Sequence, residues 1–220
     1  ALLRFDEASF GYGDLPALFN SVCFSVDQSS RIAILGRNGA GKSTLIKLLL
    51  GKLKARGGTI TRHRGARIEY IAQHHLDELD GDSRPLKLAL DRFPGDGSNS
   101  HELKMRMHLG HFGLSGDVLP NQLIRTLSGG QKFRVSLALA MYTKPHMLIM
   151  DEPTNHLDME TIDALVKAIE EFKGGVMVVS HDEHLISSCC KELRLVANKR
   201  VTQYHGTIET YKKAILTGKV

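Results

Sequence analysis

Short apolar runs separated by turns dominate the chain. Three segments that each contain four consecutive apolar residues predict buried strands of a parallel sheet, at residues 31–35, 146–150 and 176–179. Apolar residues at helical spacing follow the first two of these strands, over residues 42–50 and 158–172. Strands that alternate with helices in this way predict an α/β fold with a parallel-sheet core flanked by helices.

The two ends of the chain show strand patterns of another kind. Apolar and polar residues alternate over residues 1–30, around a glycine turn at 11–13, which predicts the half-buried strands of an antiparallel β subdomain. Residues 57–60 and 67–71 predict a further antiparallel pair. A last alternating region, 193–204, precedes a short terminal helix.

Residues 79–143 have mainly helical spacing, interrupted by a loop rich in glycine and proline at 94–100. We interpret this stretch as a helical subdomain inserted into the α/β unit. Ser128 stands where it can cap the last helix of the stretch, and Pro145 prevents that helix from continuing. The length of 220 residues and the hydrophobic fraction of 42% predict one domain, residues 1–220.

Composition excludes several classes of protein. No apolar run approaches 18 residues and no basic and apolar leader opens the chain, so we expect neither a membrane span nor a secretory signal. The three cysteines, Cys23, Cys189 and Cys190, lack the spacing of metal ligands and predict a reducing, cytoplasmic environment. Since the chain begins almost inside its first strand, we expect it to be part of a longer protein.

The net charge is +5, and part of it is concentrated in one segment. Six basic residues lie close together in the sequence: Lys52, Lys54, Arg56, Arg62, Arg64 and Arg67. They fit either a contact with RNA or another polyanion, or a solvated strand-and-turn surface. No aromatic residue is interleaved with them, so we do not expect a platform for stacked bases.

The segment between the first buried strand and its helix carries the first candidate chemistry. Residues 36–43 follow the pattern Gly-x-x-x-x-Gly-Lys-Ser between a strand and a helix, the context of a phosphate-binding loop. Backbone N–H groups and the helix N-terminus attract phosphate oxygens. Lys42 adds a positive charge between the outer phosphates, and Ser43 offers a hydroxyl to Mg²⁺, which prefers oxygen ligands.

Two carboxylates and a histidine follow the other buried strands. Ligands of open α/β sheets bind beyond the carboxyl ends of the strands, so Asp151, Glu152 and His181 should reach the same site as the phosphate loop. We expect Asp151 to hold Mg²⁺, directly or through water, and Glu152 to polarise a water for in-line attack on a γ-phosphate. His181 would hold that phosphate and orient the water and the base.

A second anion-binding segment opens the helix that runs from about residue 130 to 142. Ser128, Gly129 and Gly130 combine a hydroxyl with unshielded backbone amides at a helix N-terminus. Taken alone, the segment also fits an ordinary capped helix. Together with the phosphate loop, it indicates a nucleotide site assembled from two copies.

These motifs resemble those of an ATP-binding-cassette (ABC) ATPase, a P-loop NTPase, over nearly all of the chain. Residues 36–44 match its Walker A loop, residues 146–152 its Walker B strand, and residues 127–131 its signature. Further matches are the adenine-stacking aromatic, the Q-loop glutamine, the D-loop and the switch histidine, at Tyr12, Gln73, Asn155 to Asp158, and His181.

The resemblance implies a role for each matched residue. Nucleotide would be bound by Tyr12, Gly36, Arg37, Asn38, Gly39, Ala40, Gly41, Lys42, Ser43 and Thr44. The catalytic residues would be Glu152, His181 and Gln73, and Mg²⁺ would be held by Ser43, Gln73 and Asp151. The choice of ATP rests on the resemblance, because stacking on Tyr12 tolerates any purine.

The resemblance also implies a head-to-tail dimer of two cassettes, with each ATP between the Walker A loop of one and the signature of the other. The signature residues Ser128, Gly129, Gly130 and Gln131 would therefore act in trans. The second cassette would come from the same chain or from an identical one. ATP would hold the dimer together and hydrolysis would release it.

Two kinds of cassette fit: the ATPase subunit of a membrane transporter, and subfamily F, whose paired cassettes on one chain lack a membrane domain and generally act on ribosomes. Residues 152–158 and 180–182 resemble subfamily F, and residues 73–77 and 204–211 resemble the C-terminal cassette of its eukaryotic members. We therefore expect a ribosome or translation factor as partner. A transporter subunit, or an ATP-binding interaction module with little turnover, is the alternative.

Overall fold

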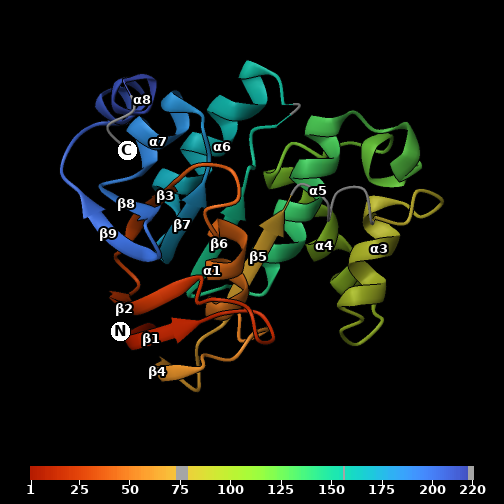
Figure 1. Ribbon diagram of the computed structural model, residues 1–220. Helices are drawn as coiled ribbons and strands as arrows, with labels where there is room; N and C mark the ends of the chain where they lie inside the picture. The colour runs from red at the N-terminus through yellow and green to blue at the C-terminus, as the bar shows by residue number, and fades with distance from the viewer. Residues whose placement is uncertain (73–78, 156, 218–220) are drawn as a thin grey trace.

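The computed structural model describes residues 1–72, 79–155 and 157–217, and their strands form two sheets (Figure 1). The three-stranded sheet is antiparallel, in the order β2-β1-β4. The six-stranded sheet has the order β5-β6-β7-β3-β8-β9 and is parallel except for the pair β8-β9. The strands are β1 (Leu3–Phe10), β2 (Phe19–Val26), β3 (Arg31–Leu35), β4 (Gly57–Arg62), β5 (Ile68–Ala72), β6 (Met147–Asp151), β7 (Gly175–Val179), β8 (Glu192–Ala197) and β9 (Arg200–Tyr204).

Helices cover the six-stranded sheet, and three of them, α3 to α5, extend to one side of it (Figure 1). The helices of the described residues are α1 (Lys42–Leu49), α3 (Pro85–Arg92), α4 (Asn99–His111), α5 (Gly129–Tyr142), α6 (Met159–Glu171), α7 (Glu183–Cys189) and α8 (Ile208–Leu216), with short 3-10 turns η1 (Leu119–Asn121) and η2 (Ile124–Thr126). No helix in the described part of the chain has the length and apolar character that a membrane span requires.

The predicted α/β fold with a parallel core is confirmed. The apolar runs of β3, β6 and β7 are buried on both faces of the sheet. One face packs with α1 against the three-stranded sheet, and the other is covered by α5, α6 and α7. Helices α3 and α4 pack against α5 in a cluster of their own, and α8 packs beside β3 and β8.

The predicted antiparallel pair of residues 57–60 and 67–71 is wrong. Strand β4 pairs with β1 in the three-stranded sheet, whereas β5 pairs parallel with β6 in the other sheet. A short turn at Ala66, whose N–H donates to the carbonyl of His63, does separate the two strands. At this turn the chain passes from one sheet to the other. Strand β5 joins the six-stranded sheet, where the side chains of Ile71 and Ala72 are buried.

Two members of the basic segment make structural contacts. Arg67 donates from Nε to the carbonyls of Thr143 and Lys144, both at 3.0 Å, and so ties the start of β5 to the end of α5. Arg56 donates from Nη1 to the carbonyl of Leu15 at 3.1 Å. These two guanidinium groups hold loops in place, which supports the structural reading for them.

Candidate functional site

The loop between β3 and α1 has the curled backbone that a phosphate-binding loop requires. Gly39 and Gly41 have φ angles of 82° and 105°, in the region that favours glycine. A Cβ on Gly41 would also lie 2.9 Å from Cζ of Phe19, so two constraints select glycine here. Lys42 opens α1 and donates from Nζ to the carbonyls of Gly36 (2.7 Å) and Arg37 (3.2 Å), which closes the loop on itself.

A cavity of about 620 Å³ lies over this loop and brings together nine of the residues predicted from the sequence. Those that line it are Tyr12, Asn38, Gly39, Gly41, Lys42, Ser43, Thr44, Asp151 and Glu152. The lining also includes Leu15, Pro16, Leu18 and Val179, which the sequence patterns did not indicate. Gly36, Arg37 and Ala40 shape the loop but do not line the cavity. Gln73 lies outside the described residues.

The sheet order explains why these residues meet. Strand β7 lies between β3 and β6, and all three run parallel, so their carboxyl ends share one edge. Glu152 leaves β6 with a φ of 49° and donates its N–H to the carbonyl of Val179 at 2.7 Å, which ties the end of β6 to the end of β7. His181, two residues beyond β7, lies with Nε2 3.4 Å from Oε1 of Glu152.

Electrostatics at this edge follow from partial burial. Burial raises the pKa of Glu152, and the neighbouring Asp151 carboxylate adds to that rise, while His181 and Lys42 oppose it. Burial also lowers the pKa of Lys42, against the pull of Glu152 and Asp151. The result is a cluster of one ammonium and two carboxylates, able to bind a phosphate chain with a cation and to polarise a water.

Tyr70 is a residue of the site that the sequence analysis missed. Its hydroxyl donates to Oδ2 of Asp151 at 3.2 Å, from the adjacent strand β5. Burial is the largest cause of the raised pKa of Tyr70, followed by the charge of Asp151, so the phenol stays protonated and remains a donor. A hydroxyl-bearing aromatic near the end of an apolar strand, three residues before Gln73, was the available signal.

The glycine-rich segment before α5 lies away from the cavity. Ser128 Oγ accepts from the Gln131 N–H at 3.2 Å, and Gln131 Oε1 accepts from the Ser128 N–H at 2.9 Å. This capping box confirms Ser128 as the helix cap. Ser128 and Gly129 are exposed, and neither they nor Gly130 and Gln131 line the cavity.

Asp158 stands next to this segment rather than at the cavity. Its Oδ1 accepts from the Thr161 N–H at 2.8 Å and caps α6. A Cβ on Gly130 would lie 2.7 Å from Oγ1 of the same Thr161. The N-termini of α5 and α6, with Gly130 and Asp158, therefore meet at Thr161, apart from the cavity over residues 36–44.

The sequence matches the ABC transporter family over residues 19–155, more than half of the chain. The chain belongs to the ABC transporter family. It is an ATPase cassette of this family.

The sequence of this cassette is similar to those of subfamily F proteins. It is 45% identical to ABC transporter F family member 3 of Arabidopsis thaliana over 97% of this chain and 29% of that protein. It is 43% identical to ATP-binding cassette sub-family F member 3 of Homo sapiens (96% and 29%) and 40% identical to Protein GCN20 of Saccharomyces cerevisiae (98% and 28%). The chain thus spans less than a third of the length of these relatives.

Solved structures show the same fold. A nucleotide-free ATP-binding cassette from an ABC transporter superposes with a TM-score of 0.78 at 21% identity, over 98% of this chain and 95% of that one. A dimeric post-hydrolysis cassette bound to ADP and Pi gives 0.72 at 21% identity, over 93% and 99%. The predicted ABC cassette fold is confirmed.

Proposed function

We propose that the chain is a cytoplasmic ATPase cassette of a subfamily F protein, which couples ATP turnover to a conformational change on the ribosome or a translation factor. The observation that carries the proposal is identity of 40–45% with subfamily F proteins across nearly the whole cassette. The segment from Glu152 to Asp158, which reads Glu-Pro-Thr-Asn-His-Leu-Asp, adds the wording typical of that subfamily.

The nucleotide lies in the cavity over residues 36–44. The loop amides and Lys42 hold the phosphates, and Lys42 then exchanges its contacts with the carbonyls of Gly36 and Arg37 for phosphate oxygens. Tyr12, whose ring is 42% exposed at the cavity wall, offers a face for the adenine.

Residues at the cavity suit Mg²⁺, which prefers oxygen ligands and shares them with phosphates. The Ser43 hydroxyl and the Asp151 carboxylate line the same cavity and would hold the ion, with Gln73 proposed as a third ligand. Tyr70 orients Asp151 through its hydrogen bond. When bound, the ion supplies positive charge next to the phosphates.

Glu152 is the proposed general base. Partial burial and the raised pKa make it a stronger proton acceptor than an ordinary exposed carboxylate, so it can polarise the water that attacks the γ-phosphate. His181, 3.4 Å away, orients that water and the phosphate. Gln73 is proposed to sense the γ-phosphate from the segment after β5.

The second half of the site comes from another cassette. Ser128, Gly129, Gly130 and Gln131 are proposed to contact a nucleotide held by the partner, because Ser128 and Gly129 are exposed at a helix N-terminus. Asp158 lies beside them and would face the same interface. The partner is a second cassette of the same longer protein or an identical chain.

Replacement of Glu152 tests the enzymatic part of the proposal. Glu152→Gln should keep ATP affinity, lower turnover about 100-fold or more, and accumulate an ATP-bound dimer. Turnover, nucleotide binding and sedimentation in ATP measure the three effects. Glu170→Gln, an exposed carboxyl on α6, is the matched control and should behave as wild type. Unchanged hydrolysis in Glu152→Gln would remove Glu152 from the mechanism.

Cosedimentation tests the cellular partner. The full-length protein should sediment with ribosomes in ATP when it carries Glu152→Gln, since the bound state cannot be released by hydrolysis. Recovery with membranes in place of ribosomes would favour a transporter subunit. An ATP-binding protein with wild-type Glu152 and no measurable turnover at high concentration, even with its partner cassette, would favour an interaction module.

A further inference from the structure

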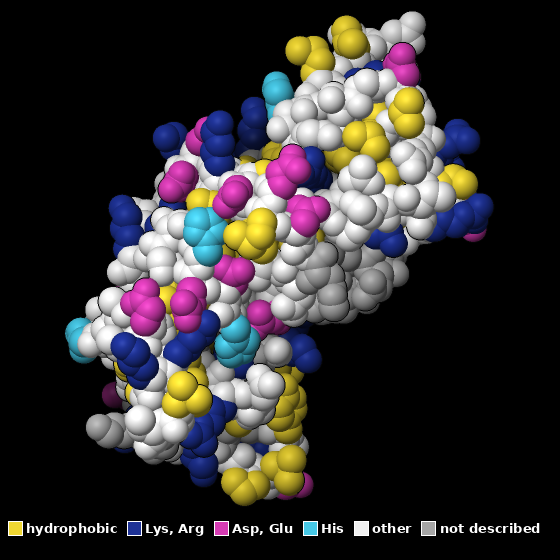
Figure 2. Space-filling view, turned by 90° about the horizontal axis from the view of Figure 1, so that it is seen from above, with side chains coloured by type: hydrophobic (Ala, Val, Ile, Leu, Met, Phe, Trp, Pro, Cys, Tyr) yellow, Lys and Arg dark blue, Asp and Glu magenta, His cyan; other side chains and the backbone are white. Residues whose placement is uncertain are grey.

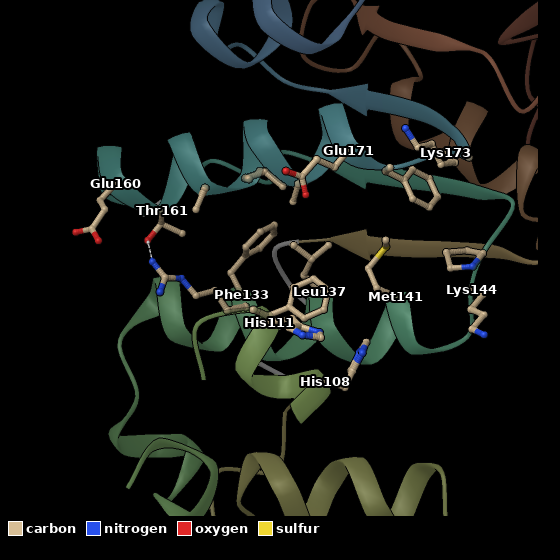
Figure 3. Close-up of a pocket in the computed structure, with 18 residues that line it drawn as sticks. His108, His111, Phe133, Leu137, Met141, Lys144, Glu160, Thr161, Glu171 and Lys173 are labelled. Atoms are coloured by element: carbon tan, nitrogen blue, oxygen red, sulfur yellow. Dashed lines mark hydrogen bonds between the residues drawn. The ribbon is translucent and has the colours of Figure 1, made fainter. Parts of the chain in front are cut away.

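A groove between α5 and α6 is larger than the nucleotide cavity, at about 850 Å³, and lies apart from it. Figure 3 shows Phe133, Leu137 and Met141 directed from α5 toward α6, where Leu165 and Ala168 complete an apolar floor. Ala164 on its rim is exposed, so the groove opens to solvent. The proposed ATPase mechanism uses none of these residues.

The two walls of the groove differ in charge: the α4–α5 wall is basic, whereas the α6 wall carries two carboxylates and is followed, just beyond the helix, by Lys173 (Figure 3). The wall built by α4 and α5 carries Arg134 and Lys144 together with His108 and His111, and a cavity that continues across α4 adds Lys104. The carboxylates among the described lining residues, Glu160 and Glu171, both lie on α6 (Figure 3). Lys104, Lys144 and both glutamates are exposed, and none of the four makes an ion pair within the described part of the chain.

Arg134 adds an independent observation, because one of its hydrogen-bond donors lacks an acceptor. Its guanidinium bridges the loop at Gly113 and the start of α6, where Nη2 lies 3.5 Å from Oγ1 of Thr161. Its Nε is buried and has no hydrogen-bond partner among the residues that the structure describes. A buried guanidinium donor without an acceptor is costly.

We propose that this groove binds an amphipathic helix of a partner protein, with apolar side chains on the floor and carboxylates against the α4–α5 wall. Charge complementarity selects the occupant: an acidic flank would meet Lys104, Lys144 and Arg134, while the opposite flank would meet Glu160 and Glu171. Residues 133–142 on α5 give the groove about three helical turns of length.

Docking here would act on both helices that reach the cassette interface. Helix α5 begins at Gly129 and α6 at Met159, and their first turns meet through Gly130 and Thr161. A helix bound between α5 and α6 would therefore change the distance between the signature residues 128–131 and Asp158. This consequence for turnover rests on the proposed function, whereas binding itself does not.

Peptide binding to the 220-residue chain tests the groove. The probe is a labelled amphipathic peptide of about 14 residues, with a leucine stripe and glutamates along one flank, and its twin carries lysine at each glutamate position. Each exposed ion pair contributes about two- to threefold in affinity, so fluorescence anisotropy should show about tenfold tighter binding of the acidic peptide. Lys104→Glu with Lys144→Glu should reverse the preference, and Lys213→Glu on α8 should leave it unchanged.

Blocking the groove separates a bound helix from general attraction of charge. Ala164→Trp should reduce acidic-peptide binding at least about tenfold, because an indole would occupy the rim, while Glu170→Trp on another face of α6 should not. Circular dichroism of each variant confirms that the fold is retained.

Several outcomes would overturn the inference. Equal affinity for the two peptides would remove the charge argument, and acidic-peptide binding that survives Ala164→Trp would place the site elsewhere. Single-stranded RNA that displaces the peptide, and binds Ala164→Trp as well as wild type, would make the basic wall a phosphate surface. Self-association abolished by Ala164→Trp would make the groove an interface between copies. Each result is independent of ATPase activity.

Discussion

Two tyrosines bond to residues that line the cavity over residues 36–44, and they serve different purposes. The Tyr12 hydroxyl shares a hydrogen bond with Oγ1 of Thr44 at 3.0 Å, and its ring makes a T-shaped contact with Phe10, which holds the ring at the cavity wall. Tyr70 donates to Asp151 from the neighbouring strand. Tyr12 is therefore proposed to contact the base of the nucleotide, whereas Tyr70 orients the carboxylate that is proposed to hold Mg²⁺.

Substitution of Tyr12 should affect binding and leave the chemical step intact. Tyr12→Ala removes the stacking face and should weaken ATP binding by about 1–3 kcal/mol, on the order of tenfold or more, with kcat unchanged once the site is saturated. Tyr12→Phe retains the ring and should stay within about threefold of wild type, because it loses only one partly buried hydrogen bond, to Thr44. Steady-state kinetics give KM and kcat for both. Equal affinities in the two variants would contradict stacking on this ring.

Substitution of Tyr70 should alter the requirement for Mg²⁺. Tyr70→Phe leaves Asp151 without the hydroxyl that orients it, so the Mg²⁺ concentration for half-maximal turnover should rise about tenfold. The control is Tyr204→Phe, which removes a phenol hydroxyl that bonds to Thr210 and does not contact Asp151. It should not shift that Mg²⁺ concentration. A Tyr70→Phe variant with a normal Mg²⁺ titration would show that Asp151 does not need this partner.

At the scale of elements, the meeting of α5 and α6 depends on the absence of one side chain. Gly130 sits in the first turn of α5, and Oγ1 of Thr161 occupies the place that a Cβ would need. Thr161 is itself 4% exposed, so it has little room to move away. Substitution at Gly130 must therefore shift one helix relative to the other.

A pair of substitutions tests this contact. Gly130→Ala should lower the free energy of unfolding by about 1–3 kcal/mol, because the added methyl overpacks the junction despite the better helix propensity of alanine. Thr161→Ala removes Oγ1 but keeps the N–H that Asp158 caps, so the combined variant should recover most of that loss. Urea unfolding of the four proteins gives the coupling energy. If the losses of unfolding free energy in the two single variants add up in the combined variant, Gly130 and Thr161 are not in steric conflict.

Elements with local signals were predictable, and distant pairings were not. Ser128 and Asp158 identify the starts of α5 and α6 because a capping side chain bonds within its own first turn. The pairing of β4 with β1 joins residues almost sixty positions apart, and no local pattern encodes it. The turn at Ala66 looked like a hairpin because the sequence shows the turn and not the sheet that each strand joins.

On the scale of the whole molecule, the same limit applies to the site. Strand ends at a shared sheet edge made the meeting of Lys42, Asp151 and Glu152 predictable. The hydrogen bond of Tyr70 and the groove between α5 and α6 arise from packing between distant segments, so periodicity did not reveal them. Figure 2 shows acidic side chains and histidines over the middle of one face, beside a lobe with exposed hydrophobic side chains.

Mixing two inactive variants tests whether the separated half-sites of this molecule work in trans. Lys42→Met disables the phosphate loop of its own copy, and Ser128→Arg disables the segment offered to a partner, so each protein alone should lose turnover. In a mixed dimer, the loop of the Ser128→Arg copy faces the intact segment of the Lys42→Met copy. An equal mixture should therefore regain about a quarter of the wild-type rate. Random pairing makes half of the dimers mixed, and each mixed dimer has one intact site of two.

The control replaces the Ser128→Arg partner with a chain that carries both substitutions. That mixture contains no intact loop and should stay inactive. The recovered rate should rise with protein concentration, because it depends on pairing. Absence of recovery at concentrations where the wild type is active would show that the second half of the site does not come from another copy of this chain.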